Sequence, residues 1–150
     1  MVKHTECIHV NRSPEQVYEF IADAANDVRW RPEVQRSELV EGQPAQPGAK
    51  YRQVMKPGRK ETVGTHEIVS TTPGQRVEWR TPPGEGPVDF SGSYIVEREG
   101  DGSRVCLDTR VQAKGPMRFA SPVMSWYLKR LSRRYANSLK DAAERSPTST

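Results

Sequence analysis

The sequence predicts an α+β domain made of a seven-stranded antiparallel sheet, two short helices after the first strand and a long C-terminal helix. Valine, which favours strands, outnumbers leucine by 15 to 5, and most valines lie in short runs that alternate with polar residues. The C-terminal part instead repeats its apolar residues at helical spacing. A chain of 150 residues can bury one core, so we expect a single domain over residues 1–145 and a disordered polar tail over residues 146–150.

The segment CIHVNRSPEQVYEFIADAAND predicts a strand that ends at Val10, followed by a helix. Ser13 is placed to cap the helix, Pro14 occupies its first position and Gln16 completes a capping box. The apolar residues that follow recur at helical spacing, and a proline ends the helical region shortly after Trp30. Trp30 therefore lies where a short helix gives way to a strand.

Residues 34–111 contain strand-length segments separated by the turn-like stretches GQPAQPG, KPGRK, TTPGQ, PPGEGP and EGDGS. A tight turn fixes which residues face each other, so each hairpin predicts a register. A two-residue turn in EGDGS brings Tyr94 opposite Leu107. A six-residue loop at PPGEGP brings Trp79 opposite Phe90, and the TTPGQ turn brings Ile68 opposite Trp79.

The same pairings can be checked on the opposite, solvated face, where unlike charges should meet across strands. They place Arg80 between Glu67 and Asp89, and Glu97 beside Arg104. We therefore predict a meander with one polar convex face and one apolar concave face.

A long helix is predicted to begin near Pro116, with a kink or restart at Ser121 and Pro122. Its apolar stripe comprises Met117, Ala120, Met124, Tyr127, Leu128, Leu131, Tyr135 and Leu139. Its solvated face carries Lys129, Arg130, Arg133, Arg134 and Lys140.

Several classes of function are disfavoured by composition. The N-terminal MVKHTECIHV lacks the apolar core of a signal peptide and no apolar run reaches about 18 residues, which predicts a cytoplasmic protein without stable membrane insertion. Cys7 and Cys106 are far apart and the three histidines form no cluster, so we expect no disulfide framework, no metal site and no cofactor. With 23 basic against 19 acidic residues, the mixed surface predicts no nucleic-acid partner.

The order of elements resembles the START-like, or SRPBCC, helix-grip superfamily, and is most similar to its polyketide cyclase/dehydrase branch. The resemblance rests on IHVNRSPEQVYEFIADAANDVRWRPEV, PGAKYRQV, TTPGQRVEWR and GSYIVEREGDGSRV, and covers nearly the whole chain. It implies a curved sheet wrapped round the last helix, with a cavity between them. It says little about activity, because one fold can carry many functions.

The resemblance implies that Trp30 stands at the cavity entrance with Arg29 and Arg31 turned to solvent. A plain core position for Trp30 is the alternative, while stacking on nucleic acid would need several aromatic residues along a basic groove. The predicted ligand-binding residues are Trp30, Tyr51, Gln53, His66, Trp79, Phe90, Tyr94, Met124 and Leu128. Most of these types also suit a solid core, but the polar Gln53 and His66 have little use in one.

His66 is the only candidate general acid or base on that face, and the catalytic residues are otherwise unknown. We expect a monomer or homodimer that binds a hydrophobic small molecule such as a lipid, polyketide or aromatic metabolite. A cyclase/dehydrase-type enzyme acting on such a ligand is the alternative. A protein-interaction module that uses the basic helix is a third possibility.

Overall fold

The computed structural model describes residues 1–56, 58–85, 88–115 and 121–145. The described chain forms one seven-stranded sheet and its helices, in which all neighbouring strands are antiparallel in the order β1-β7-β6-β5-β4-β3-β2. The elements are β1 (Val2–Val10), α1 (Pro14–Ala22), the 3₁₀ turn η1 (Ala24–Asn26), α2 (Asp27–Trp30), β2 (Val34–Glu41), β3 (Lys50–Met55), β4 (Thr62–Thr72), β5 (Arg76–Arg80), β6 (Val88–Glu99), β7 (Gly102–Ala113) and α3 (Ser121–Arg145).

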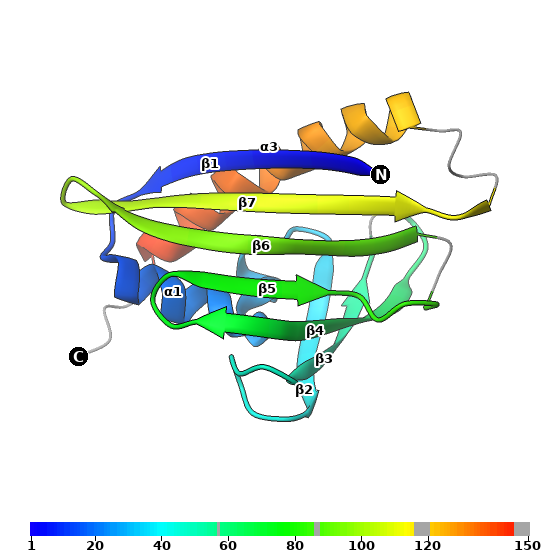
Figure 1. The fold of residues 1–150 in the computed structure, drawn as a ribbon, viewed down its shortest axis with the longest axis horizontal. Coiled ribbons are helices and arrows are strands. Elements are labelled where there is room, and N and C mark those ends of the chain that lie inside the picture. Colours follow the sequence, from blue (N-terminus) through cyan, green and yellow to red (C-terminus); the bar gives the residue numbers. More distant parts are fainter. Residues whose placement is uncertain (57, 86–87, 116–120, 146–150) are drawn as a thin grey trace.

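The sheet curves around α3, which confirms the predicted helix-grip arrangement. In Figure 1, β2 and β3 run at a steep angle to β6 and β7, and α3 lies across one face of the sheet. The core between them includes Val10 of β1, Ile21 of α1, Ile68 of β4 and Leu139 of α3. The apolar residues of α1 and α3 thus face the concave side of the sheet, as expected for helices with one apolar face.

The start of α1 follows the predicted capping pattern. The Ser13 side chain accepts a hydrogen bond from the Gln16 backbone N–H, and the Gln16 side chain accepts one from the Ser13 backbone N–H. Pro14 occupies the first turn, where its missing N–H costs nothing. Because the cap fixes where α1 begins, it also positions η1 and α2 over the end of the sheet.

The β6–β7 hairpin has the predicted register throughout. The matching pairs are Phe90 with Val111, Gly92 with Thr109, Tyr94 with Leu107, Val96 with Val105 and Glu97 with Arg104. Gly100 supplies the positive φ of 59° that the tight turn requires. Ile68 also lies opposite Trp79 as predicted, despite a bulge one residue later in β4.

The predicted pairing of Trp79 with Phe90 is wrong by two residues. Trp79 lies opposite Gly92, and Phe90 instead exchanges hydrogen bonds with Thr81. Glycine is needed at position 92 because a Cβ there would lie 3.0 Å from Trp79 Cζ2 and still closer to the Asp108 backbone oxygen. A shift of two keeps every side chain on its predicted face, so the concave surface is unchanged.

The same shift alters one predicted ion-pair arrangement on the convex face. Arg80 contacts Glu67 at 2.6 Å as predicted, but lies opposite Ser91. Asp89 pairs with Lys114 at 3.0 Å.

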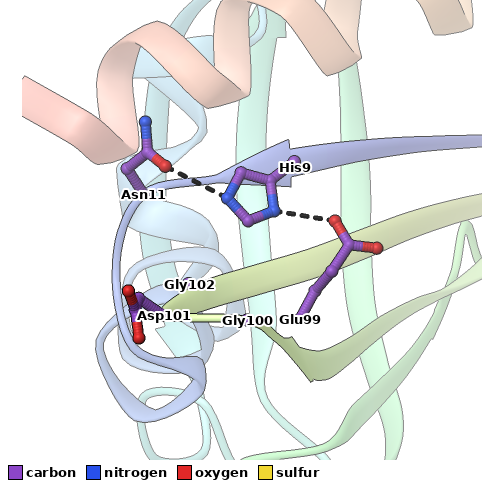
Figure 2. Close-up of a pocket in the computed structure, with 6 residues that line it drawn as sticks. All are labelled: His9, Asn11, Glu99, Gly100, Asp101 and Gly102. Atoms are coloured by element: carbon purple, nitrogen blue, oxygen red, sulfur yellow. Dashed lines mark hydrogen bonds and ion pairs between the residues drawn. The ribbon is translucent and has the colours of Figure 1, made fainter.

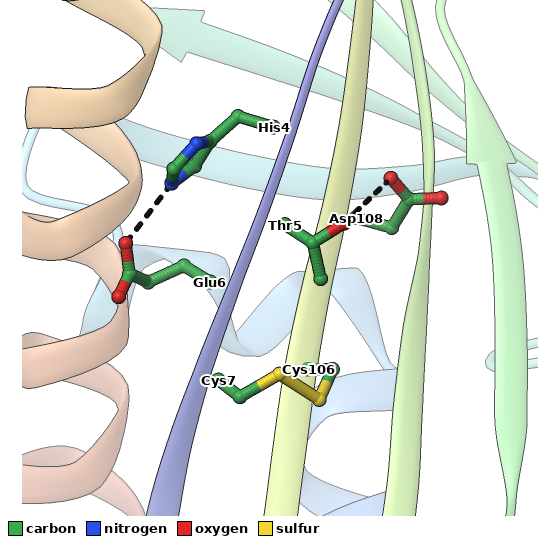
Figure 3. The surroundings of a disulfide bond; sticks show 6 residues. All are labelled: His4, Thr5, Glu6, Cys7, Cys106 and Asp108. Atoms are coloured by element: carbon green, nitrogen blue, oxygen red, sulfur yellow. Dashed lines mark hydrogen bonds and ion pairs between the residues drawn. A yellow bond between two sulfur atoms is a disulfide. The ribbon is translucent and has the colours of Figure 1, made fainter.

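The sequence left open whether Cys7 and Cys106 approach each other, and in the structure they are bonded as a disulfide. They are cross-strand partners in β1 and β7, with Cα atoms 4.0 Å apart. Figure 3 shows the disulfide and Thr5 on the side of β1 away from α3, whereas His4 and Glu6 lie on the side toward α3. A separation of 99 residues in the sequence concealed a direct contact that the β1–β7 register creates.

The last helix is described from Ser121, so the predicted start near Pro116 and the stripe residues Met117 and Ala120 lie outside the described residues, as does the tail over residues 146–150. Leu128 and Leu139 of the predicted stripe are buried. No helix among the described residues is long and apolar enough to cross a membrane.

Candidate ligand-binding cavity

A cavity of about 270 Å³ lies between the concave face of the sheet and α3. Its volume is slightly below the range of about 300 to 1,000 Å³ that is usual for small-molecule sites. The residues that line it are Trp30, Arg31, Glu33, Gln53, Met55, Thr62, Gly64, Thr65, His66, Trp79, Thr81, Phe90, Tyr94, Leu107, Thr109, Tyr127, Leu128, Leu131, Ser132 and Tyr135.

Aromatic rings form a continuous wall of this cavity. The Trp30 indole packs edge-on against Tyr94 at 5.7 Å and Tyr135 at 5.8 Å between ring centroids. Tyr94 in turn contacts Trp79, whose indole stacks on His66 at 5.2 Å with 20° between the planes. Edge-on and stacked pairs fix the rings against one another, so the wall is preformed.

Polar groups gather at the end of the cavity where α2 meets β3. Arg31 Nη1 donates to Asp27 Oδ2 at 3.1 Å and to Gln53 Oε1 at 3.2 Å. Gln53 Nε2 donates to Asp27 Oδ2 at 2.7 Å and to Ser37 Oγ at 3.1 Å. Gln53 is thus buried because it completes a polar network around the Asp27–Arg31 ion pair.

The Asp27 carboxylate is fully buried. Burial raises its pKa above the ordinary value, and the charge of Arg31, with hydrogen bonds from Gln53 and Arg31, partly offsets that rise. The indole N–H of Trp30 also helps to hold this pKa down, although it lies outside hydrogen-bonding geometry. The carboxylate therefore serves to fix Arg31 at the cavity wall.

The His66 ring is buried in the wall with no hydrogen-bond partner among the described residues. Burial, with a smaller contribution from the charge of Arg31, lowers its pKa from 6.5 to about 3. The imidazole is consequently neutral near pH 7. No carboxylate contacts it within the described parts of the chain, so it lacks the orienting group of a histidine in a catalytic triad.

One further polar group of the wall is free to meet a ligand. Burial raises the pKa of Tyr94, so its phenol keeps its proton. Tyr94 lines the cavity, and its hydroxyl makes no hydrogen bond with any described residue. The Trp79 indole N–H also has no acceptor among the described residues, but its nitrogen is buried and does not face the cavity.

Most of the predicted site residues line the cavity, but two do not. Trp30, Gln53, His66, Trp79, Phe90, Tyr94 and Leu128 line the cavity, whereas Tyr51 and Met124 do not. The Tyr51 hydroxyl instead donates to Asp23 at 2.9 Å and accepts from the Ala45 N–H at 3.1 Å, and neither partner lines the cavity. Burial raises its pKa to about 12.

The structure shows Trp30 to be both a core residue and a cavity residue, and it corrects the expected orientation of Arg31. Its side chain is 1% exposed and belongs to the core, yet it also lines the cavity. Arg29 is exposed as expected, but the Arg31 side chain is only 14% exposed and points inward to Asp27. A buried Trp30 is not available to stack on a nucleic-acid base.

Asp27 and Arg31 were missed by sequence reasoning. Their spacing of four residues was the available signal, since it puts both side chains on one face of a helical turn. Arg31, like Arg29, is instead expected from the sequence to face solvent.

A second hollow lies at the β6–β7 hairpin, outside the cavity. Figure 2 shows the His9 ring between Asn11 and Glu99. Its Nε2 lies 3.0 Å from Asn11 Oδ1 and its Nδ1 lies 2.7 Å from Glu99 Oε1, both as hydrogen bonds. The remaining lining residues are Gly100, Asp101 and Gly102 of the turn. Among the described residues, no three His, Cys, Asp or Glu side chains are grouped as metal ligands there or elsewhere.

A seven-stranded sheet curved round α3, with a cavity between them, defines a protein of the helix-grip fold class. A family model described as "Polyketide cyclase / dehydrase and lipid transport" matches residues 1–144, so the chain belongs to this family. No curated protein sequence matches the chain.

Similar solved structures include both cyclases and START proteins. The aromatase/cyclase ZhuI from a Streptomyces species is 16% identical with a TM-score of 0.77, over 95% of this chain and 93% of that one. A START superfamily protein from Mycobacterium smegmatis is 15% identical with a TM-score of 0.80, over 95% and 97% of the two chains. The di-domain aromatase/cyclase BexL is 22% identical with a TM-score of 0.80, over 96% of this chain but 47% of the longer one. At these identities the likeness concerns the fold alone.

Proposed function

We propose that this protein binds a hydrophobic small molecule, such as a lipid, polyketide or aromatic metabolite, in the cavity between the sheet and α3. The observation that carries the proposal is a preformed aromatic wall that encloses a cavity with a few hydrogen-bonding groups, among them the Arg31–Gln53 pair at one end. Apolar lining with a few placed polar groups is typical of small-molecule sites. The family description, which includes lipid transport, supports it.

The polar groups suggest which part of the ligand would lie deepest. Arg31 is already paired with Asp27, and Glu33 lines the same cavity, so the site offers no net positive charge for an anion. The Tyr94 hydroxyl can instead donate to a neutral oxygen. We therefore expect a ligand with a carbonyl or hydroxyl at its inner end and an apolar remainder.

The test begins with native mass spectrometry of freshly purified protein and solvent extraction of any co-purified molecule. A Leu131→Trp substitution should fill the cavity and abolish uptake of an apolar fluorescent probe. Val63→Trp, on an exposed position of β4, is the matched control and should leave uptake unchanged. Equal uptake by both variants would refute binding in the cavity.

A cyclase/dehydrase-type reaction on such a ligand is the second candidate function. It is favoured by the convergence of Arg31, His66 and Tyr94 on one cavity. With its pKa lowered to about 3, His66 is a weak base, so polarisation of a substrate carbonyl by Tyr94 and Arg31 is the better-supported role. Turnover that is lost in Tyr94→Phe while probe binding persists would establish this function.

The cytoplasm is the compartment we propose. Cytosolic thiols are kept reduced, so Cys7 and Cys106 would be free thiols in the cell and would pair on oxidation. Alkylation of a rapidly quenched lysate, followed by mass spectrometry of the two cysteines, tests this. A fully oxidised pair would point to an oxidising compartment.

A further inference from the structure

The outward face of the first half of α3 carries three large apolar side chains that are each more than half exposed. Val123, Trp126 and Tyr127 are 69%, 61% and 53% exposed. They lie three and four residues apart, which places them together on one face of the helix. By contrast, Leu128 on the opposite side is buried against the sheet.

Three arginines continue the same face toward the middle of the helix. Arg130, Arg133 and Arg134 are all exposed, and the Arg130 guanidinium lies over the Trp126 ring at 5.5 Å. The first acidic residue of α3 is Asp141, two turns beyond Arg134. This face, which we name the α3 outer face (Val123, Trp126, Tyr127, Arg130, Arg133 and Arg134), is therefore apolar at one end and positive at the other.

The α3 outer face is continuous with the mouth of the cavity. Tyr127 belongs to both, because it is exposed and also lines the cavity. Across the mouth, the exposed Phe90 of β6 lines the cavity as well. An apolar surface pressed against this mouth would therefore meet the cavity directly.

We propose that the α3 outer face docks the protein reversibly onto an anionic membrane surface, with the cavity mouth toward the lipid. Tryptophan and tyrosine favour the headgroup level of a bilayer, and arginines can pair with lipid phosphates there. The combination of apolar side chains and unopposed positive charge fits such a surface. This inference rests on the outer face alone and holds whether or not the cavity ligand is a lipid.

Vesicle sedimentation with the full chain tests the proposal. Vesicles of phosphatidylglycerol mixed with phosphatidylcholine should bind the protein, and vesicles of phosphatidylcholine alone should bind it much less. The triple variant Arg130→Gln, Arg133→Gln, Arg134→Gln should bind about a hundredfold more weakly, at about a factor of five for each lost charge. The matched control Arg98→Gln, Arg104→Gln, Arg110→Gln removes the same charge from exposed positions of β6 and β7 and should bind like the wild type.

Tryptophan fluorescence gives an independent readout. Of the three tryptophans, Trp30 and Trp79 are buried and Trp126 is exposed, so a blue shift on adding anionic vesicles should disappear in Trp126→Phe. Equal losses in both triple variants, or no binding to anionic vesicles, would overturn the proposal. So would a Val123→Ser, Trp126→Ser variant that converts a dimer into monomers without weakening vesicle binding, since the face would then be a subunit interface.

Discussion

His66 lies flat against Trp79 across neighbouring strands, with 5.2 Å between the ring centroids. The stack buries a titratable ring in an apolar wall, and the nearest charge that affects it, Arg31, is positive. Both effects favour the neutral imidazole. The pair thus makes this part of the cavity aromatic and uncharged, which suits an apolar ligand.

The first prediction is that His66 lowers stability in mild acid. Its pKa is about 3 in the folded protein against 6.5 in the unfolded chain. As the pH falls below 6.5, only the unfolded chain takes up this proton, so the free energy of unfolding should fall by up to about 1.4 kcal/mol per pH unit. Chemical denaturation at several pH values should show this slope in the wild type and a reduced slope in His66→Gln.

A His4→Gln variant is the control for the loss of one histidine, because His4 lies on β1 outside the cavity wall. This variant should keep the part of the pH dependence of the free energy of unfolding that His66 contributes in the wild type. In a proton NMR titration, the His66 ring should not shift between about pH 8 and pH 5. A His66 ring that titrates in this range would contradict a buried neutral imidazole.

The second prediction concerns the Asp27–Arg31 pair. Asp27→Leu leaves the Arg31 charge buried without its partner and should lower the free energy of unfolding by about 3 to 5 kcal/mol. The double variant Asp27→Leu, Arg31→Met removes both charges and should recover much of this loss. Denaturant titrations of the two single variants and the double variant give the coupling free energy, and a value near zero would show that the ion pair is not formed.

Arg31→Met has its own signature in this series. Without the arginine, burial is opposed by less, chiefly by the hydrogen bond from Gln53, and the pKa of Asp27 should rise further. Between the pKa values of Asp27 in the unfolded and folded states, the folded state then holds a proton that the unfolded chain has released. This variant should therefore lose less stability than the wild type as the pH falls toward 4.

The fold and most of the cavity wall could be predicted from the sequence because strand pairing has a period of two. Even where the β5–β6 register was wrong by two residues, Trp79, Phe90 and Tyr94 stayed on the concave face. The polar end could not be predicted in this way. Asp27 and Arg31 lie on a single helical turn whose orientation is set by packing of Trp30, and charged residues there ordinarily face solvent.

The disulfide was missed for a related reason. Whether Cys7 meets Cys106 depends on which strand lies beside the first one, and β1 pairs with the last strand of the sheet. No turn connects these two strands, so no local pattern fixes their register.

The third prediction is that the disulfide stabilises the fold without affecting the cavity. It closes a long loop, with a sequence separation of 99 residues, and the loop-closure entropy of such a loop corresponds to about 4 to 5 kcal/mol. The oxidised protein should therefore melt well above the reduced protein, and the Cys7→Ser, Cys106→Ser variant should melt like the latter. Probe binding should be unchanged, because neither cysteine lines the cavity. Equal melting temperatures with and without reductant would mean that the pair is not bonded in solution.

The last prediction separates packing from binding at Trp30. If the Trp30 indole were only half packed at a cavity entrance, its removal would lower the free energy of unfolding by less than about 2 kcal/mol, the ordinary range for positions outside a packed core. Trp30 is instead 1% exposed and contacts both Tyr94 and Tyr135, so Trp30→Ala should destabilise by about 3 to 5 kcal/mol. Because the same indole lines the cavity, probe affinity should fall in the fraction that remains folded.

Trp126→Ala changes an exposed tryptophan of α3 and is the control. It should change the free energy of unfolding by no more than about 0.5 kcal/mol. Thermal melts and probe titrations on both variants test this prediction. A small loss of stability in Trp30→Ala would show that the indole is loosely packed at the cavity entrance.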